Sequence, residues 1–205
     1  MTPASDIAFT PTVKALQSAR GSRDAYARME ERGGFRTEID EGLEEFLAGI
    51  DTAYLATANA DGQPYAQHRG GPKGFIRALD AHTLAFADYT GNKQYISTGN
   101  LADNAKAFLF LMDYAHKRRI KIWGEAKVSD DPALIAQLMP DNHRARPEQA
   151  IVFSVAAWDA NCPQHIPQKL DAADVARAID HLKARIAELE ATNAALVAQL
   201  AGEPR

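Results

Sequence analysis

The sequence contains a single cysteine, Cys162, so it cannot form an internal disulfide. It also lacks any apolar run near the roughly 20 residues that are needed to span a bilayer. Residues 1–6 do not show the charged-then-apolar pattern of an export signal. We therefore expect a cytoplasmic protein that does not act at a membrane.

An excess of positive charge is missing as well. The net charge is −4, so the basic residues form local concentrations in an acidic protein, and we do not expect nucleic-acid binding. No catalytic triad, carboxylate pair or metal-ligand cluster stands out. The pair Cys162 and His165 lacks a second pair of ligands, which argues against zinc, and nothing places a base beside Cys162.

The hydrophobic content of 46% in 205 residues is enough to bury a core in one domain with appendages. Loosely helical spacing predicts two short helices over residues 10–32, packed on the outside of that domain. A further helix is predicted over 38–49, where Gly49 can terminate it. We expect an N-terminal helical extension at 1–37, a central domain at 38–168 and a C-terminal helix at 169–205.

The central domain reads as a series of strands. Asn59-Ala60-Asp61-Gly62 is typical of a hairpin turn between the first two strands. Runs of β-prone residues predict strands at 52–58, 64–69, 75–80, 83–88, 107–112 and 118–128, with one more at 150–157. A short helix is expected after Asp131-Pro132. The pattern predicts a mainly β (α+β) fold, a six-stranded antiparallel split barrel with flanking helices and a C-terminal coiled-coil-like helix.

The segment from Asp171 onward has a heptad repeat. Two interleaved rows of residues recur every seven positions, namely Val175, Leu182, Leu189 and Leu196, and Ile179, Ile186, Asn193 and Leu200. They correspond to the d and a positions of a two-stranded coiled coil, in which an asparagine at a fixes the register and favours dimers. The alternative is a single amphipathic helix that folds back on the barrel.

Residues 83–101 have the pattern of a phosphate site. A β-prone run ends at Tyr89, a polar turn follows at 90–92, and a helix is expected that carries Lys93, Gln94 and Ser97. The free N–H groups and positive dipole end of a helix attract an anion, and a lysine adds a full charge. A strand, a turn and a helix can equally be structural.

Two more basic segments lie on β-prone runs, at 67–75 and at 117–124. In the first, Arg69 and His68 point to opposite faces unless the break at Gly70-Gly71 redirects them. Arg69 can alternatively pair with a surface carboxylate, and His68 can be a hydrogen-bonded core histidine. In the second, one face is charged and the other carries Ile120 and Ile122.

The order of these three segments resembles the FMN-binding split-barrel family typified by pyridoxamine 5'-phosphate oxidase, over roughly residues 40–166. The resemblance implies that Arg69 and Lys93 contact the FMN phosphate, although Asn92 stands where the family has a basic residue. It also implies a homodimer with the cofactor at the subunit interface, where a C-terminal tryptophan and basic residue approach the flavin. The implied cofactor-binding set is His68, Arg69, Gly70, Gly71, Asn92, Lys93, Gln94, Ser97, Arg119, Lys121, Trp158, Gln164 and His165.

The function that the resemblance implies is an FMN-dependent oxidoreductase acting on an unidentified small molecule. A flavin needs few protein acids or bases, so the absence of a triad fits this interpretation. The alternatives are a module of the same fold that binds or carries flavin or haem without turnover, and an interaction protein with an empty barrel. The catalytic residues are not identified by the sequence.

Overall fold

The computed structural model describes residues 2–140, 143–161 and 163–202. It consists of two compact units, Met1–Asp113 with Lys117–His165, and Tyr114–His116 with Ile166–Arg205. The first unit contains the β-sheet, and the second contains the long helix α6 (Ala172–Gly202).

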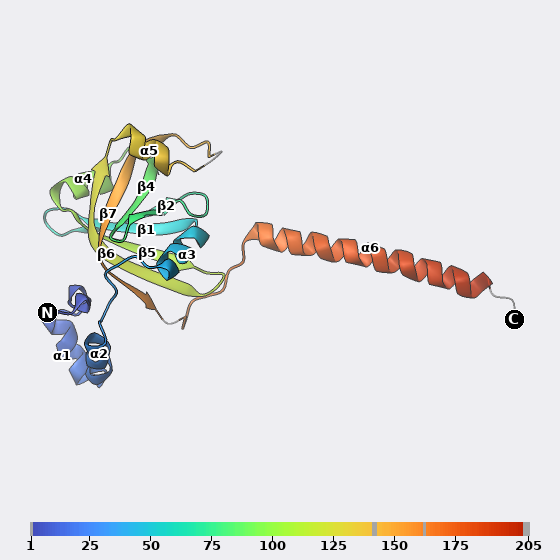
Figure 1. Ribbon diagram of the computed structural model, residues 1–205, viewed down its shortest axis with the longest axis horizontal. Helices are drawn as coiled ribbons and strands as arrows, with labels where there is room; N and C mark the ends of the chain where they lie inside the picture. The colour runs from blue at the N-terminus through green and yellow to red at the C-terminus, as the bar shows by residue number, and fades with distance from the viewer. Residues whose placement is uncertain (1, 141–142, 162, 203–205) are drawn as a thin grey trace. The chain divides into compact units, whose positions relative to one another are not determined.

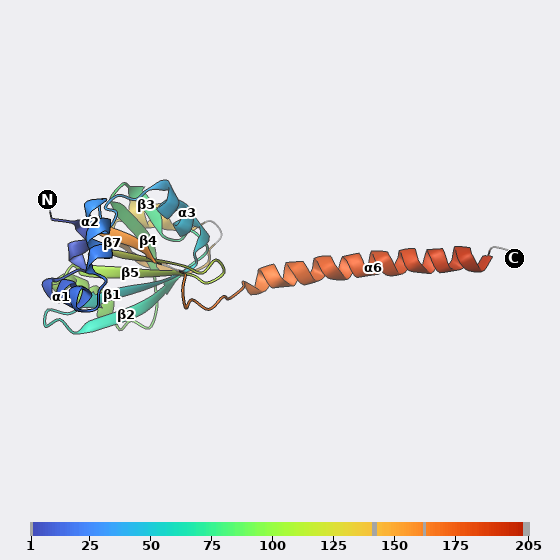
Figure 2. The same cartoon turned by 90° about the horizontal axis from the view of Figure 1, so that it is seen from below.

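The sheet of the first unit has seven antiparallel strands. They are β1 (Thr52–Ala58), β2 (Pro64–Gly70), β3 (Arg77–Asp80), β4 (Thr83–Tyr89), β5 (Lys106–Asp113), β6 (Arg118–Ser129) and β7 (Pro147–Asn161), in the order β2-β1-β5-β6-β7-β4-β3. Figure 2 shows β2, β1 and β5 on one side of a split barrel and β7, β4 and β3 on the other. The predicted mainly β split-barrel fold is confirmed, but the predicted count of six strands is wrong. Because β7 pairs with both β6 and β4, it belongs to the same sheet.

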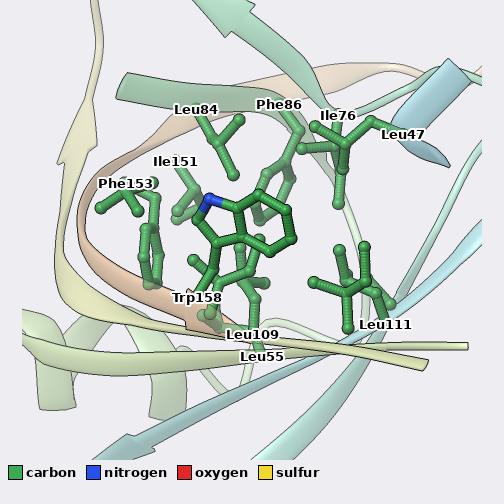
Figure 3. Packing of buried hydrophobic residues seen from close by; sticks show 14 of the residues in the cluster. Leu47, Leu55, Ile76, Leu84, Phe86, Leu109, Leu111, Ile151, Phe153 and Trp158 are labelled. Carbon is green, nitrogen blue, oxygen red and sulfur yellow. The ribbon is translucent and has the colours of Figure 1, made fainter. Parts of the chain in front are cut away.

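The core lies inside this barrel and is made by alternating residues. Ala53 and Leu55 of β1, Leu109 and Leu111 of β5, and Ile122 of β6 are each 0% exposed. Figure 3 shows how side chains from several strands converge there, among them Leu55, Leu84, Phe86, Leu109, Ile151, Phe153 and Trp158. The alternation of β6 was predicted correctly, because Ile120 and Ile122 point inward.

A β-bulge changes the phase of β7 and brings Trp158 into the core. Opposite β6, Ala157 pairs with Trp123 whereas Val155 pairs with Gly124, which leaves Ala156 as an extra residue. Trp158 therefore shares the inner face with Ile151 and Phe153 and is only 2% exposed. Its indole Nε1 donates a hydrogen bond to the Glu38 carbonyl at 2.7 Å.

The N-terminal segment contributes η1 (Ala4–Ile7), α1 (Pro11–Ala19) and α2 (Arg23–Glu31). Figure 1 shows α1 and α2 beside the N-terminus. Aromatic rings join this segment to the outer face of the sheet, because Phe9 contacts Phe35 at 5.4 Å and Phe35 stacks on Trp123 of β6 at 5.1 Å between ring centroids. The two helices predicted over 10–32 are thus confirmed, and Phe35 connects them to the barrel.

Three helices adjoin the strands, α3 (Glu41–Gly49), α4 (Ile96–Asp103) and α5 (Pro132–Leu138). Asp40 caps α3 by accepting from the Leu43 N–H at 2.9 Å, and Asp131 caps α5 by accepting from the Ala133 N–H at 2.9 Å. The apolar side of α5 packs its fully buried Leu138 near Ala85, Ala87 and Ala150. The hairpin at residues 59–62 is also as predicted, with Gly62 at φ 84°.

Helix α6 confirms the helix predicted from residue 171 onward. All residues from 172 to 201 are exposed, including the apolar residues of both heptad rows. The pairing of this helix remains a prediction. Within the described ranges, no helix combines the length and the apolar character that crossing a membrane requires.

Candidate functional site

A polar pocket lies where β2, β4, the start of β7 and the first turn of α4 come together. It holds a cavity of about 50 Å³, which is enough for a few water molecules. Its lining residues are Gln67, Arg69, Asp88, Tyr89, Gly91, Asn92, Lys93, Tyr95, Ser97, Thr98, Glu148 and Gln149. The pocket thus brings together Arg69, Asn92, Lys93 and Ser97, which were predicted as one site.

Arg69 is the central cation of this pocket. Its side chain is 12% exposed and forms an ion pair with Asp88, whose side chain is 10% exposed. A second guanidinium nitrogen donates to Gln67 Oε1 at 3.2 Å. An arginine has five N–H donors, so three remain, and the buried Nε–H has no hydrogen-bond partner among the described residues. Arg69 does pair with a carboxylate, but Asp88 is buried and is not the surface carboxylate that the alternative expected, and the pair leaves donors for a ligand.

The loop before α4 differs from the prediction. Lys93 and Tyr95 have φ values of 58° and 53°, a left-handed conformation that cannot continue a helix. The helix therefore begins at Ile96, so the prediction that it carries Lys93 and Gln94 is wrong. The Asn92 side chain accepts a hydrogen bond from the Gln94 N–H at 3.2 Å, which holds the turn.

The same loop leaves donors near the pocket. Lys93 is exposed, and it forms no ion pair with any residue that the structure describes. The residue before α4, Tyr95, makes no side-chain hydrogen bond to the first turn of the helix in the part of the chain that the structure describes. The N-terminal N–H groups of such a turn are available to an anion.

A hydrogen-bond network fixes the floor of the pocket. Ser97 donates to Gln67 Oε1 at 2.8 Å, which ties α4 to β2. Gln149 of β7 donates to Asp88 at 2.9 Å and to the Thr98 hydroxyl at 3.0 Å. Asp88 therefore uses one oxygen for Arg69 and the other for Gln149, so it positions the guanidinium.

A second carboxylate lies at the edge of the pocket. The Tyr95 hydroxyl donates to Glu148 at 2.7 Å, and this hydrogen bond raises the pKa of Tyr95 above its usual value. Among the lining residues, Arg69 and Lys93 are balanced by Asp88 and Glu148. A bound anion would therefore be held mainly by directed donors and less by a surplus of positive charge.

Eight of the residues that line this pocket were not in the predicted set, namely Gln67, Asp88, Tyr89, Gly91, Tyr95, Thr98, Glu148 and Gln149. Asp88 is the last residue of a predicted strand, and nothing else in the sequence indicated that it belongs to the site. Gln149 and Glu148 were missed because β7 begins at Pro147, before the predicted start at residue 150. Their neighbours in the pocket are distant in sequence, so no local pattern could have found them.

Gly70, Gly71 and His68 are not among the residues that line the pocket. A Cβ at Gly71 would come within 2.7 Å of the Phe75 Cβ, so the close backbone approach that was predicted there is made to the chain's own phenylalanine. A Cβ at Gly70 would meet His68 Cε1 at 3.0 Å. His68 is exposed, on the face of β2 opposite Arg69, and its ring contacts Tyr54 edge-on at 5.8 Å. It is therefore not a core histidine.

Arg119 and Trp158 line a different pocket, of about 300 Å³, together with Arg36, Arg118 and Phe46. The guanidinium of Arg36 lies 4.6 Å from the centroid of the Trp158 ring, which is otherwise buried. Arg118 pairs with Asp113 at 3.0 Å. The Arg119 Nε–H is buried and has no hydrogen-bond partner in the described part of the chain.

The remaining predicted residues are dispersed. Lys121 lies on the outer face of β6, where it pairs with Asp159 at 3.2 Å. Gln164 and His165 lie in an exposed turn, and Cys162 is outside the described residues. Within the described ranges, no group of three or more His, Cys, Asp or Glu side chains could hold a metal ion.

Comparison with known families gives a match to one model, described as pyridoxamine 5'-phosphate oxidase, over residues 39–162. This range is more than half of the chain, and it includes all the lining residues of the first pocket and those of the second except Arg36. A search of curated proteins found no match.

The chain is similar to several solved structures. HupZ of Group A Streptococcus has a TM-score of 0.50 and 16% identity, over 64% of this chain and 99% of its own. An FMN-binding protein of Syntrophomonas wolfei has a TM-score of 0.45 and 15% identity, over 72% and 97%. General stress protein 26 of Bacillus anthracis has a TM-score of 0.45 and 14% identity, over 57% and 88%. At these identities the likenesses concern the fold alone.

Proposed function

Because the family match covers more than half of its length, the chain belongs to the pyridoxamine 5'-phosphate oxidase family, and we propose that it is a flavoprotein that binds FMN by its phosphate in the pocket of Arg69 and Lys93. The observation that carries this proposal is the hydrogen bonding of the Arg69 guanidinium. Its guanidinium is fixed by Asp88 and Gln67, and a buried Nε–H is left without a partner in the described residues. A buried donor without an acceptor is costly, and a phosphate oxygen would satisfy it.

The other donors of the pocket fit the same group. Lys93 supplies an ammonium that forms no ion pair within the described residues, and the first turn of α4 supplies N–H groups and a positive dipole end. The lining of the pocket is mostly polar and charged, which suits the phosphate better than the isoalloxazine ring. In this proposal the ring is held by residues outside the pocket.

A subunit interface is where we place the ring. In this part of the proposal the protein is a homodimer. One protomer binds the phosphate of FMN, and the pocket of Arg36, Arg118 and Arg119 in the other protomer faces the flavin ring. The unpartnered Nε–H of Arg119 supports a polar ligand there. Buried Trp158 would serve as the floor beneath Arg36 rather than as a stacking partner. A cytoplasmic location belongs to the same proposal.

The proposed reaction class is FMN-dependent oxidation or reduction of a small molecule. Bound FMN supplies the redox chemistry. The protein's own residues hold the phosphate, orient the cofactor and place positive charge beside it. No residue is assigned as a proton donor.

The phosphate assignment is tested by comparing FMN with riboflavin, which lacks the phosphate. Lys93→Ala should weaken FMN by about 1.5–3 kcal/mol, the range of a charged hydrogen bond, and leave riboflavin unchanged. Arg69→Ala should act in the same direction. Lys127→Ala, which removes an exposed cation of β6 outside the pocket, is the matched control and should change neither affinity. Equal losses for FMN and riboflavin in the Lys93 variant, measured by flavin fluorescence, would refute the assignment.

Turnover requires a second measurement. The FMN-loaded protein should bleach under anaerobic conditions with NADH or NADPH and recover its colour in air. If dithionite reduces the flavin and neither nucleotide does, nicotinamide-dependent turnover is refuted. A sharp Soret-type band in the purified protein would instead favour the haem-binding alternative.

A further inference from the structure

Helix α6 has an apolar face that is exposed along its length. It is 31 residues long, which corresponds to about 46 Å. In one heptad row Leu182, Leu189 and Leu196 are 60%, 51% and 53% exposed, and in the other Ile179, Ile186 and Leu200 are 45%, 54% and 74% exposed. We propose that α6 pairs with α6 of a second copy of this chain as a parallel, in-register coiled coil. The inference concerns the homodimer part of the proposed function and does not depend on FMN.

Asn193 sets the direction of the helices. It occupies an a position in a row that is otherwise isoleucine and leucine. In a parallel, in-register pair the two Asn193 side chains face each other and can exchange hydrogen bonds, which is how an asparagine at a specifies a two-stranded coiled coil. In a fully overlapping antiparallel pair Asn193 would face Leu182 and its amide would be left unsatisfied.

The flanking charges set the register. In a parallel pair a g residue faces the e residue five positions further along the partner, so Arg185 faces Glu190 of the partner helix, twice by symmetry. Arg185 also donates to Glu188 of its own helix at 2.8 Å, whereas Glu190 forms no ion pair within the described residues. The second copy therefore supplies Glu190 with its cation.

Shifts of one heptad are disfavoured by the same residues. A shift of one heptad in either direction places Arg185 of one copy opposite Lys183, a like charge, and Arg185 of the other copy opposite Val197. Either shift also separates the two Asn193 side chains. The charges alone would tolerate an antiparallel pair, in which Lys183 faces Glu190, so the direction rests on Asn193 and the register on Arg185 with Glu190.

A parallel pair has a consequence for the barrels. It places the two Ala172 ends side by side, whereas an antiparallel pair would separate them by about 46 Å. Ten residues connect the end of β7 to the start of α6. The parallel arrangement thus raises the effective concentration of the two barrels for each other.

The test uses disulfide capture in the full chain with Cys162→Ser. Leu196→Cys is a d position, and a parallel, in-register pair brings the two sulfurs within disulfide distance. A fully overlapping antiparallel pair would separate them by roughly 25 Å. The matched control is Ala198→Cys, an f position on the opposite side of the same turn. In a glutathione buffer we expect at least tenfold more linked dimer for Leu196→Cys, and equal amounts for both variants would overturn the proposal.

The register is tested by exchanging the charges. Arg185→Glu and Glu190→Arg should each raise the dimer dissociation constant about threefold to tenfold, measured by sedimentation. The double variant should recover more than the sum of the single effects predicts, because the pair is restored in reversed order. Purely additive effects would overturn the assignment of Arg185 to Glu190. Neither readout involves flavin, so failure here leaves the FMN proposal untouched, and the converse also holds.

Discussion

Substitution of Asp88 by asparagine should test how Arg69 is held and whether a phosphate lies next to it. Asp88 pairs with Arg69, and both side chains are nearly buried. Asparagine keeps the size and can still accept a hydrogen bond, but it removes the charge. In the protein without ligand, Arg69 is then left without its counter-ion.

The size of the effect follows from burial. Breaking a buried ion pair by removing one partner costs about 3–5 kcal/mol, and the retained hydrogen bond places Asp88→Asn near the lower limit, about 3 kcal/mol. Asp159→Asn is the matched control. Its partner Lys121 lies 3.2 Å away, and the two side chains are 31% and 23% exposed, so the loss there should be about 0–1 kcal/mol.

Urea denaturation with and without ligand measures both effects. Bound phosphate would supply the missing negative charge, so saturating FMN should stabilise the Asp88→Asn variant more than the unmodified protein, and riboflavin should stabilise both equally. If Asp88→Asn loses no more stability than Asp159→Asn, the Arg69 pair is not a buried structural pair. If FMN and riboflavin act alike on the variant, the phosphate is not near Arg69.

Two further predictions concern the fold and the edge of the pocket. Gly124→Ala should lower the free energy of unfolding by about 3 kcal/mol or more, because the new Cβ would lie 2.0 Å from the Ser154 carbonyl oxygen at the bulge. The control Gly49→Ala, whose Cβ would have no atom within 4 Å apart from its chain neighbours and the backbone of its own helix, should change this free energy by less than about 1 kcal/mol. A denaturant titration measures both. Glu148→Gln should lower the pKa of Tyr95, followed by the ultraviolet absorbance of the phenolate, because a charged acceptor for the hydroxyl is lost. Because the pKa of Tyr95 is raised in the folded protein, the tyrosine of the unfolded chain loses its proton at a lower pH. The contribution of the Tyr95–Glu148 hydrogen bond to the free energy of unfolding therefore declines as the pH rises above about 10. This decline should be smaller in the Glu148→Gln variant.

Local patterns in the sequence predicted the parts of this molecule whose signals are local. Alternation predicted β6 and its two faces, the Asn59 to Gly62 turn predicted the first hairpin, and the seven-residue repeat predicted α6. Lys93 could be named as a candidate because a lysine after a polar turn is visible along the chain, whereas Arg69 was named from the resemblance to the family. These features need only the side-chain periods of strands and helices.

The tertiary structure decided the rest. Asp88 and Gln149 are 61 residues apart and meet only because β4 and β7 are neighbours in the sheet. Lys93 and Tyr95 have left-handed backbone conformations, so α4 begins only at Ile96. The hydrogen bond from Ser97 to Gln67 of β2 helps to hold the helix in this position. The extra residue Ala156 reverses the alternation of β7 and turns Trp158 from a predicted ligand contact into a core side chain. A strand's period of two shows which residues share a face, but a bulge arises from how the strand pairs with its neighbours, and the sequence of one strand does not contain that pairing.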